Sequence, residues 1–229
     1  MKEFLSNSIF FGAFISLAGF ELGLVLKKKW KLAILNPLLI GVVCVMAVLL
    51  IFGVDYNHYN EGGKYISYLL TPATVSLAVP LYEQIELLKS NVKAITAGIL
   101  SGVLASLGGV WALAKLFRLN RALYITLLPK SITTAIGMGV SEELGGIVTI
   151  TVAVIVITGI LGNMTAELVF RIFGIEEPVA KGLSLGTASH AIGTAKAMEL
   201  GEIEGAMGSL AIAVAGLVTV AGASVFSLI

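Results

Sequence analysis

Long apolar runs separated by short charged clusters dominate the pattern along the chain. Runs of low charge occur at about residues 8–26, 32–54, 65–82, 92–114, 122–140, 146–170, 184–198 and 206–229. A helix needs about 20 apolar residues to cross the hydrocarbon core of a bilayer. Five runs are long enough, namely 8–26, 32–54, 92–114, 146–170 and 206–229. The pattern therefore predicts five membrane-spanning helices.

The other three runs, 65–82, 122–140 and 184–198, are shorter and are interrupted by Pro, Gly, Ser and Thr. Pro72 and Pro80 lie in the first of them and Pro129 lies in the second. Proline removes a backbone donor and clashes with the preceding helical turn, so these runs are expected to break. Broken helices survive at membrane depth only where they line a cavity or are buried in protein. We therefore expect an all-α polytopic membrane protein with five spanning helices and three broken or re-entrant segments.

Composition supports the membrane assignment and argues against several other classes of protein, such as nucleic-acid-binding proteins and enzymes. Of the 229 residues, 57% are hydrophobic and only 13% are charged, and the mean hydropathy is +0.98, whereas soluble domains are about one-quarter charged. The net charge is only +1, whereas a protein that binds nucleic acid needs a dense basic surface. The single cysteine, Cys44, permits no intrachain disulfide and no cysteine-based metal site. With no nucleophile elbow and no phosphate-binding glycine loop in the sequence, we expect no enzyme activity, cofactor or metal.

An internal repeat connects the broken runs. Moving Pro72 onto Pro129 also places Thr74 on Ser131, and a weaker third copy comprises 184–198 and 206–229. Each copy is a broken polar run followed by an apolar helix, although shared membrane composition is the alternative explanation. Repeats that carry paired broken helices are typical of transporters. The predicted organisation is one transmembrane domain, 1–229, with a helix pair in 1–54 and three repeat units in 65–229.

Two basic clusters, at residues 27–31 and 115–121, bear on the orientation of the chain. Basic loops favour the cytoplasmic face of the membrane. If every run between the clusters crossed the membrane, the two clusters would lie on opposite faces. We therefore expect residues 65–82 to cross only halfway; the alternative is that one basic loop breaks the rule.

Three passages of this sequence, Leu70–Tyr82, Leu128–Thr134 and Ser189–Ala197, resemble the LrgB/CidB family of bacterial membrane proteins. The resemblance extends over essentially the whole chain. One departure is Ala135, which stands where a proline is expected after the two threonines, and it concerns the position of the backbone break. The resemblance implies a multi-pass protein of the bacterial cytoplasmic (inner) membrane, with a small LrgA-like membrane protein as its partner.

The resemblance also implies two competing functions. One is transport of small monocarboxylates of the pyruvate, lactate, glycolate or glycerate type, by an oligomer or together with the LrgA-like partner. The other is antiholin-like regulation of murein hydrolase activity and cell lysis. A transporter requires the polar residues of the broken runs to converge on one cavity, whereas a lysis regulator does not.

Three basic side chains in the broken runs are candidates for binding a carboxylate. Lys130 can hold a carboxylate as a point charge or snorkel to the membrane surface. His190 can bind an anion or carry a proton, or it can bond between helices. Lys196 can be a second anion contact or can pair with Glu199, three positions later in the sequence.

Hydroxyl groups and a glycine complete the predicted substrate site. Each hydroxyl can donate to a substrate oxygen or back-bond to a helix carbonyl. The predicted residues are Ser131, Thr133, Thr134, Ser189, Gly193, Thr194, Thr74 and Ser76. If the third broken run is helical, His190, Gly193 and Thr194 share one face, and the glycine leaves room beside the imidazole. Helix N-termini at the breaks would add positive dipole ends for an anion.

Overall fold

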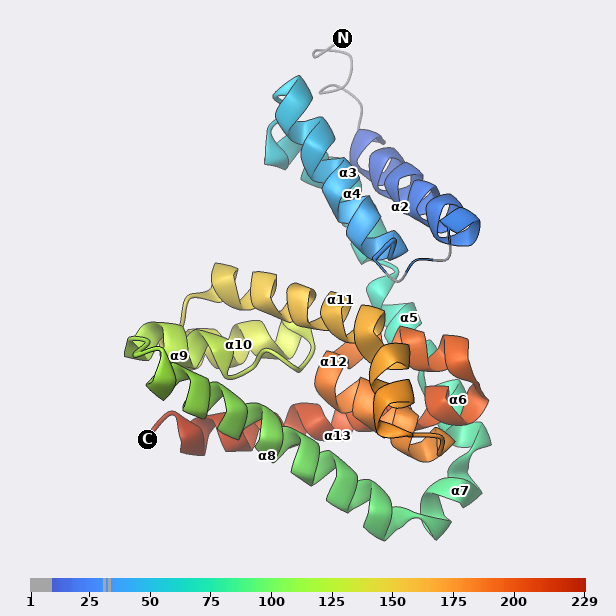
Figure 1. Ribbon diagram of the computed structural model, residues 1–229. Coiled ribbons are helices and arrows are strands. Elements are labelled where there is room, and N and C mark those ends of the chain that lie inside the picture. The colour runs from blue at the N-terminus through green and yellow to red at the C-terminus, as the bar shows by residue number, and fades with distance from the viewer. Residues whose placement is uncertain (1–9, 31, 33) are drawn as a thin grey trace. The chain divides into compact units, whose positions relative to one another are not determined.

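The computed structural model describes residues 10–30, 32 and 34–229, and only the backbone of Thr74. Residues 8 and 9 of the first predicted run and Lys31 of the first basic cluster lie outside the described residues. The ordered elements in this part of the chain are all helices, without a strand, which confirms the predicted all-α class. The chain forms two compact units, Met1–Ser76 and Leu77–Ile229 (Figure 1).

The N-terminal unit contains α2 (Phe11–Trp30), α3 (Pro37–Phe52), α4 (Tyr56–Ser67) and α5 (Leu70–Ser76). Asn36 caps α3, because its side chain accepts hydrogen bonds from the N–H groups of Leu38 and Leu39. Helix α2 packs against α3 and α4, with Phe11 and Ile15 in a small apolar core. Neither hairpin described below belongs to this unit.

Three long helices form the framework of the C-terminal unit: α8 (Val92–Leu116), α11 (Val148–Phe173) and α13 (Glu202–Phe226). Within the described residues, these helices and the stretch Tyr56–Glu83 are long and apolar enough to cross a membrane. Helix α3, with 16 residues, is a shorter apolar helix. The chain is thus a multi-pass membrane protein. The stretch Tyr56–Glu83, which ends in α6 (Ala78–Glu83), includes the run 65–82, so a half-crossing there remains a prediction.

The run that contains Pro129 forms a helical hairpin. Helices α9 (Arg121–Leu127) and α10 (Thr134–Leu144) flank a non-helical turn, 128–133. The two arms contact each other, and a Cβ atom added to Gly137 of the second arm would lie 3.5 Å from the carbonyl oxygen of Pro129 in the turn. We call residues 121–144 the first hairpin and 128–133 its tip. Helix α10 begins at Thr134 even though Ala135 replaces the expected proline.

The last broken run is also a hairpin. Helix α12 (Pro178–Leu200) is interrupted at Ser189 (φ −133°, ψ 17°) and at His190 (φ 43°, ψ −135°). A Cβ atom at Gly193 would collide with the carbonyl oxygen of Leu185, although eight residues of continuous helix would separate these positions by about 12 Å. The chain therefore reverses direction at the break. We call residues 178–200 the second hairpin and Ser189–His190 its tip.

The two hairpins enter the framework from opposite ends. The first arm of the second hairpin runs parallel to α8, since Gly98 packs against Leu183 and Gly102 against Thr187. In the first hairpin, α10 runs antiparallel to α11, with Gly137 against Ile155 and, nearer the hairpin base, the Ser141 hydroxyl 2.7 Å from that of Thr151. The base of the first hairpin therefore lies at the C-terminal end of α8, and the base of the second at its N-terminal end.

The hairpin tips meet near the middle of the long helices. Ile155 of α11, which is fully buried, contacts both hairpins: its side chain packs against Gly137, and its carbonyl oxygen lies 2.9 Å from His190 Nε2. Ser106, near the middle of α8, lies 3.1 Å from Ser131 in the tip of the first hairpin, measured between their hydroxyl oxygens. A long helix, a hairpin, a second long helix and a second hairpin thus follow one another along the chain.

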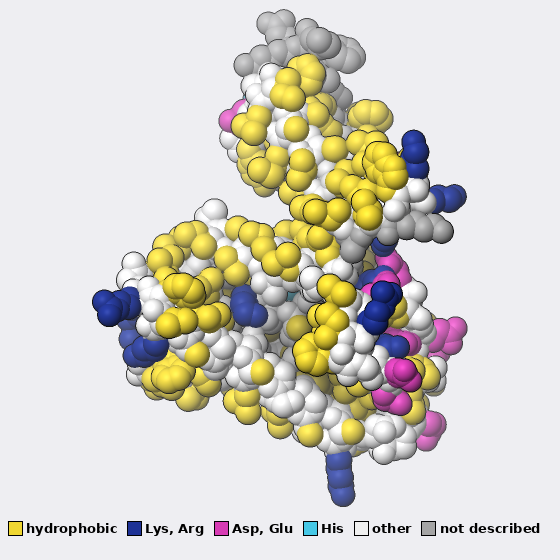
Figure 2. Space-filling model, in the orientation of Figure 1, with side chains coloured by type: hydrophobic (Ala, Val, Ile, Leu, Met, Phe, Trp, Pro, Cys, Tyr) yellow, Lys and Arg dark blue, Asp and Glu magenta, His cyan; other side chains and the backbone are white. Residues whose placement is uncertain are grey.

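Close packing by small residues holds the second hairpin in place. Gly182 packs against Glu204 and Met207, and Gly186 packs against Gly208 of α13. In lipid, such small residues allow backbones to approach closely, which is a main source of helix association. On the face that Figure 2 shows, basic side chains gather at the end near α9 and charges of both signs at the end near α6 and α12, and mostly hydrophobic side chains with a basic group among them lie between these ends.

Candidate functional site: a cavity between the hairpin tips

A cavity of about 890 Å³ lies between α8, the tip of the first hairpin and the first arm of the second hairpin. Most of its lining side chains are small, which leaves the space open. Its polar lining includes Ser101, Ser106, Lys130, Ser131, Ser184 and Thr187. Its apolar lining includes Ala94, Gly98, Gly102, Ala105, Leu183 and Ala188. The cavity therefore combines one cation and several hydroxyl donors with short apolar walls.

Lys130 provides the positive charge of the cavity and is half-buried. Its ammonium donates a hydrogen bond to the Ser131 hydroxyl at 2.9 Å, and that oxygen lies 3.1 Å from the Ser106 hydroxyl. Among the described carboxylates, none forms an ion pair with Lys130. An ammonium has three donor hydrogens, so the contact with Ser131 leaves donors for water or a ligand.

Thr187 lines the same cavity from the second hairpin and is only 5% exposed. Among the described residues, its Oγ1 is the buried side-chain oxygen or nitrogen that lacks a hydrogen-bond partner. An unpaired buried hydroxyl costs about 1–3 kcal/mol of stability. The hydroxyl is enclosed in this conformation, so a ligand oxygen or a water in the cavity would offset that cost once the side chain turns its hydroxyl toward the cavity.

The charge of the cavity is polarised along the second hairpin. Glu177 also lines the cavity, but it precedes Thr187 by ten residues, a helical rise of about 15 Å. The negative side chain therefore lies toward the base of the second hairpin, whereas Lys130 lies at the tip of the first. An anion is favoured at the inner end.

His190 is placed differently from Lys130 and does not line this cavity. Its Nε2–H donates to the Ile155 carbonyl at 2.9 Å, and the residue is 4% exposed. Room for the ring comes from α11, because a Cβ atom at Gly159 would lie 2.8 Å from His190 Nε2. The expectation that Gly193 leaves this room is wrong, since the helix breaks at His190 and Gly193 instead packs on Leu185.

Thr194 and Ser189, the other polar residues at and near the tip of the second hairpin, are also enclosed by protein. The Thr194 hydroxyl donates to the His190 carbonyl at 3.0 Å and lies 3.3 Å from the Gly208 carbonyl. Ser189 is buried against Gly162 of α11, where any Cβ atom would collide with the serine hydroxyl. The Thr194 hydroxyl thus supplies a partner for the His190 carbonyl at the backbone break, where such a group needs one. The geometry favours a structural role for this tip.

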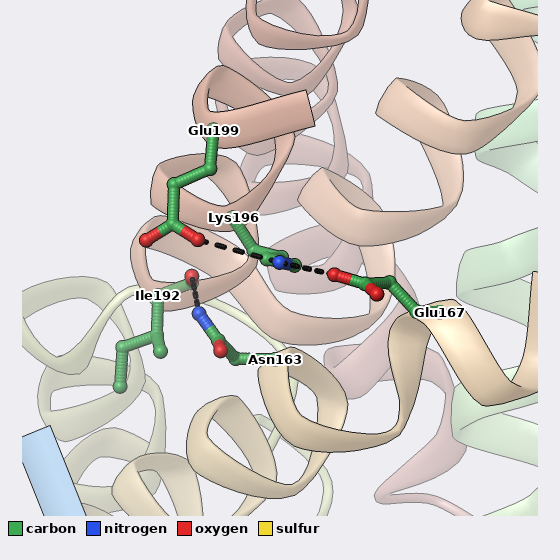
Figure 3. A network of polar contacts seen from close by, with 5 residues as sticks. All are labelled: Asn163, Glu167, Ile192, Lys196 and Glu199. Carbon is green, nitrogen blue, oxygen red and sulfur yellow. Dashed lines mark hydrogen bonds and ion pairs between the residues drawn. The ribbon is translucent and has the colours of Figure 1, made fainter. Parts of the chain in front are cut away.

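Lys196 lies between two carboxylates on the returning arm of the second hairpin (Figure 3). Its ammonium is 2.6 Å from Glu167 of α11 and 3.3 Å from Glu199. The pairing with Glu199 confirms one of the two readings of Lys196. Nearby, Asn163 donates to the Ile192 carbonyl at 3.2 Å. Together these contacts attach the returning arm to α11, and the charge of Lys196 is already balanced.

The other predicted residues lie outside the cavity lining. Thr133 is the N-cap of α10 and Thr134 its first residue, and both are half-buried. Ser76 donates to the Ala73 carbonyl at 2.7 Å, which is the back-bonding alternative. Ser76 and Thr74 belong to the N-terminal unit, and the side chain of Thr74 lies outside the described part of the chain.

The cavity thus contains Lys130 and Ser131 from the predicted set, together with Ser106 and Thr187, which were not predicted from the sequence. For Ser106, the sequence does contain an indication, namely the regular spacing of small residues along α8. Gly98, Gly102 and Ser106 follow one another at intervals of four along α8, and such positions share one helix face. Chemically, an ammonium beside hydroxyl donors suits a carboxylate, and the short walls suit a small one.

Comparisons with known proteins agree with the multi-pass architecture. The chain is 40% identical over 220 residues to the antiholin-like protein LrgB of Bacillus subtilis (strain 168), which covers 96% of this chain and 95% of that protein. It is 43% identical over 185 residues to the holin-like protein CidB of Staphylococcus aureus (strain N315), with 81% of each chain covered. No solved structure is significantly similar to it. The LrgB-like family matches residues 16–229, and the chain therefore belongs to that family.

Proposed function

We propose that the chain is a transport subunit for small monocarboxylates of the pyruvate, lactate, glycolate or glycerate type. The observation that carries this proposal is the cavity at the meeting point of two opposed hairpins, with Lys130 and hydroxyl groups in its lining. A charged side chain near the middle of a membrane protein is expensive and usually marks a substrate or ion pathway. Half-crossing helices that meet at mid-membrane are also typical of transporters.

Alternating access requires one part of the protein to move against another. Both hairpins and the cavity that Lys130 lines belong to the unit Leu77–Ile229. We infer that the hairpin unit carries the substrate and that the N-terminal unit, with an LrgA-like partner or further copies of the chain, provides the scaffold. A carboxylate bound to Lys130 would then face each side of the membrane in turn.

The test is uptake of labelled pyruvate and glycolate into proteoliposomes that contain this chain, alone and with its LrgA-like partner. Lys130→Met keeps much of the side-chain volume but removes the charge, and we expect uptake to fall at least 100-fold. The matched control is Lys93→Met, because Lys93 lies on α8 and is exposed. Its uptake should equal that of the wild type. Normal uptake by Lys130→Met, or no uptake by any combination of proteins, would contradict the proposal.

A second candidate function is antiholin-like regulation of murein hydrolase activity and cell lysis. The names of the relatives, antiholin-like and holin-like, favour it. The same pair of variants separates the two functions in cells that lack the native protein. If regulation of lysis is independent of transport, Lys130→Met should restore wild-type autolysis although it does not restore uptake. If Lys130→Met alters autolysis as much as deletion does, the lysis phenotype depends on the cavity.

A further inference from the structure

We propose that Thr187 is a specificity-determining residue of the cavity. Its hydroxyl would hydrogen-bond an oxygen on the carbon next to the carboxylate that Lys130 holds. The cavity would therefore prefer 2-oxo and 2-hydroxy monocarboxylates to carboxylates without that oxygen. This inference rests on the proposed transport function and adds the residue that distinguishes the proposed substrates from carboxylates without that oxygen.

The Thr187 hydroxyl is buried in the cavity wall without a hydrogen-bond partner in the described part of the chain, which makes it available to a ligand. Thr187 lines the cavity and is 5% exposed, and its Oγ1 has no hydrogen-bond partner among the described residues. By contrast, the buried hydroxyls of Thr126, Thr151 and Thr194 all have partners. Buried hydroxyls in helices usually back-bond to the preceding turn. In a cavity wall, a buried hydroxyl without a protein partner is a group that a ligand can use.

The position of Thr187 relative to Lys130 is the second argument. Thr187 packs against Gly102 of α8, and Ser106, which contacts the Lys130–Ser131 pair, lies four residues further along α8. One turn of helix rises about 5.4 Å, so Thr187 lies about one turn along the same wall from Ser106, whose hydroxyl is linked through Ser131 to the Lys130 ammonium. A carboxylate with an oxygen on its neighbouring carbon has a length that suits two donor groups at this separation.

The contact with Gly102 is the third argument. A Cβ atom at Gly102 would lie only 2.7 Å from the Thr187 methyl group, Cγ2. Threonine in a helix populates two χ1 rotamers, and rotation exchanges the positions of its methyl and hydroxyl groups. Glycine at 102 leaves the space in which either group can lie beside the cavity. Thr187 can therefore turn its hydroxyl toward a ligand without displacing α8.

The experiment compares two competitors of labelled pyruvate uptake, lactate and propionate, which differ by the oxygen on the second carbon. Proteoliposomes contain the full chain and its LrgA-like partner. We expect the wild type to prefer lactate, and Thr187→Val, which replaces the hydroxyl with a methyl group, to reduce that preference roughly tenfold, the value of one hydrogen bond. Thr187→Ser should retain the preference. Thr219→Val, a buried threonine of α13 outside the cavity lining, is the matched control and should behave as the wild type.

The outcomes separate this inference from the proposed function. Normal uptake with an unchanged lactate preference in Thr187→Val would overturn the role of Thr187 and leave transport intact. Absence of uptake in the wild type would overturn both. Should Thr187→Val not fold, ligand-induced stabilisation of the purified wild-type protein decides the matter. Lactate must raise its unfolding temperature more than propionate at equal concentration, and equal shifts would contradict the inference.

Discussion

The two hairpins have the same architecture but use their polar residues in opposite ways. At the tip of the first hairpin, Lys130 has one described partner, the Ser131 hydroxyl, and both residues line a cavity. At the tip of the second, His190 and Thr194 are bonded to carbonyl groups of α11, α12 and α13. A break in a membrane helix exposes backbone groups that need partners. Polar residues at a break can therefore serve the break itself or a ligand, and only their hydrogen bonds distinguish these roles.

The largest expected effect of a substitution concerns the reversal of the second hairpin. In Gly193→Ala the added methyl group would collide with the backbone oxygen of Leu185. Overpacking typically costs about 1–3 kcal/mol, and a collision with backbone, which cannot rotate away, belongs at or above the upper end of that range. In Gly139→Ala, on the first hairpin, the added methyl group meets nothing within 4 Å. We expect a clearly lower unfolding temperature for Gly193→Ala and an unchanged or higher one for Gly139→Ala. Equal unfolding temperatures in detergent would show that the chain does not reverse at Ser189–His190.

A smaller effect is expected when the polar residues at the two hairpin tips are replaced and the unfolding temperatures of the variants are compared. His190→Ala leaves the Ile155 carbonyl without its partner, which costs about 1–3 kcal/mol. Lys130→Ala removes only a contact with Ser131 and should change the unfolding temperature little. His190→Gly provides the matched control, because glycine tolerates the φ of 43° at this position and relieves about 1 kcal/mol of backbone strain. It should therefore be more stable than His190→Ala. If Lys130→Ala is the less stable of the two alanine variants, the contrast between the tips is wrong.

The smallest expected effect concerns the attachment of the second hairpin to α11. Lys196→Met removes the ion pairs with Glu167 and Glu199, whose side chains are 62% and 53% exposed. Ion pairs with such exposed partners contribute about 0–1 kcal/mol and weaken with salt. The variant should therefore unfold slightly earlier than the wild type at low salt, and the difference should shrink at 1 M salt. Lys89→Met, which breaks the exposed pair with Glu86, is the control and should have no measurable effect. A loss for Lys196→Met that is independent of salt would indicate packing rather than charge.

The positions of the helix breaks could be predicted from the sequence, but the chain reversals could not. Pro129 and the small polar residues around His190 indicate where regular helix ends, and the structure places its breaks there. Whether a chain continues or turns back after a break depends on contacts between arms, such as Gly193 with Leu185. These contacts are set by tertiary packing, and the pattern of apolar positions does not encode their direction. For the same reason, a continuous helix would place Gly193 beside the His190 imidazole, whereas Gly193 packs on Leu185.

The candidate site was predicted in part. Lys130 and Ser131 stand out because a charge and a hydroxyl follow a proline in an apolar run. Ser106 and Thr187 do not, since single hydroxyl residues are common in membrane helices, where they back-bond. Only the structure shows that Ser106 contacts Ser131 and that Thr187 lacks a partner. Lys196 was predicted as a site residue, but the structure pairs it with Glu167 at 2.6 Å. This partner lies on another helix and is distant in sequence, so the pair could not be predicted.

The packing of Gly182 and Gly186 of the second hairpin against α13 has a consequence for how the protein is made. A half-crossing hairpin is not long enough to be stable in lipid by itself, so it depends on neighbours that are already inserted. Helices α8 and α11 are synthesised before the second hairpin, but α13, against which Gly182 and Gly186 pack, is synthesised after it. The second hairpin therefore cannot complete its packing until α13 has been synthesised. Nascent chains that stop before α13 should leave it open to proteases and membrane quality control, whereas chains that include α13 should protect it.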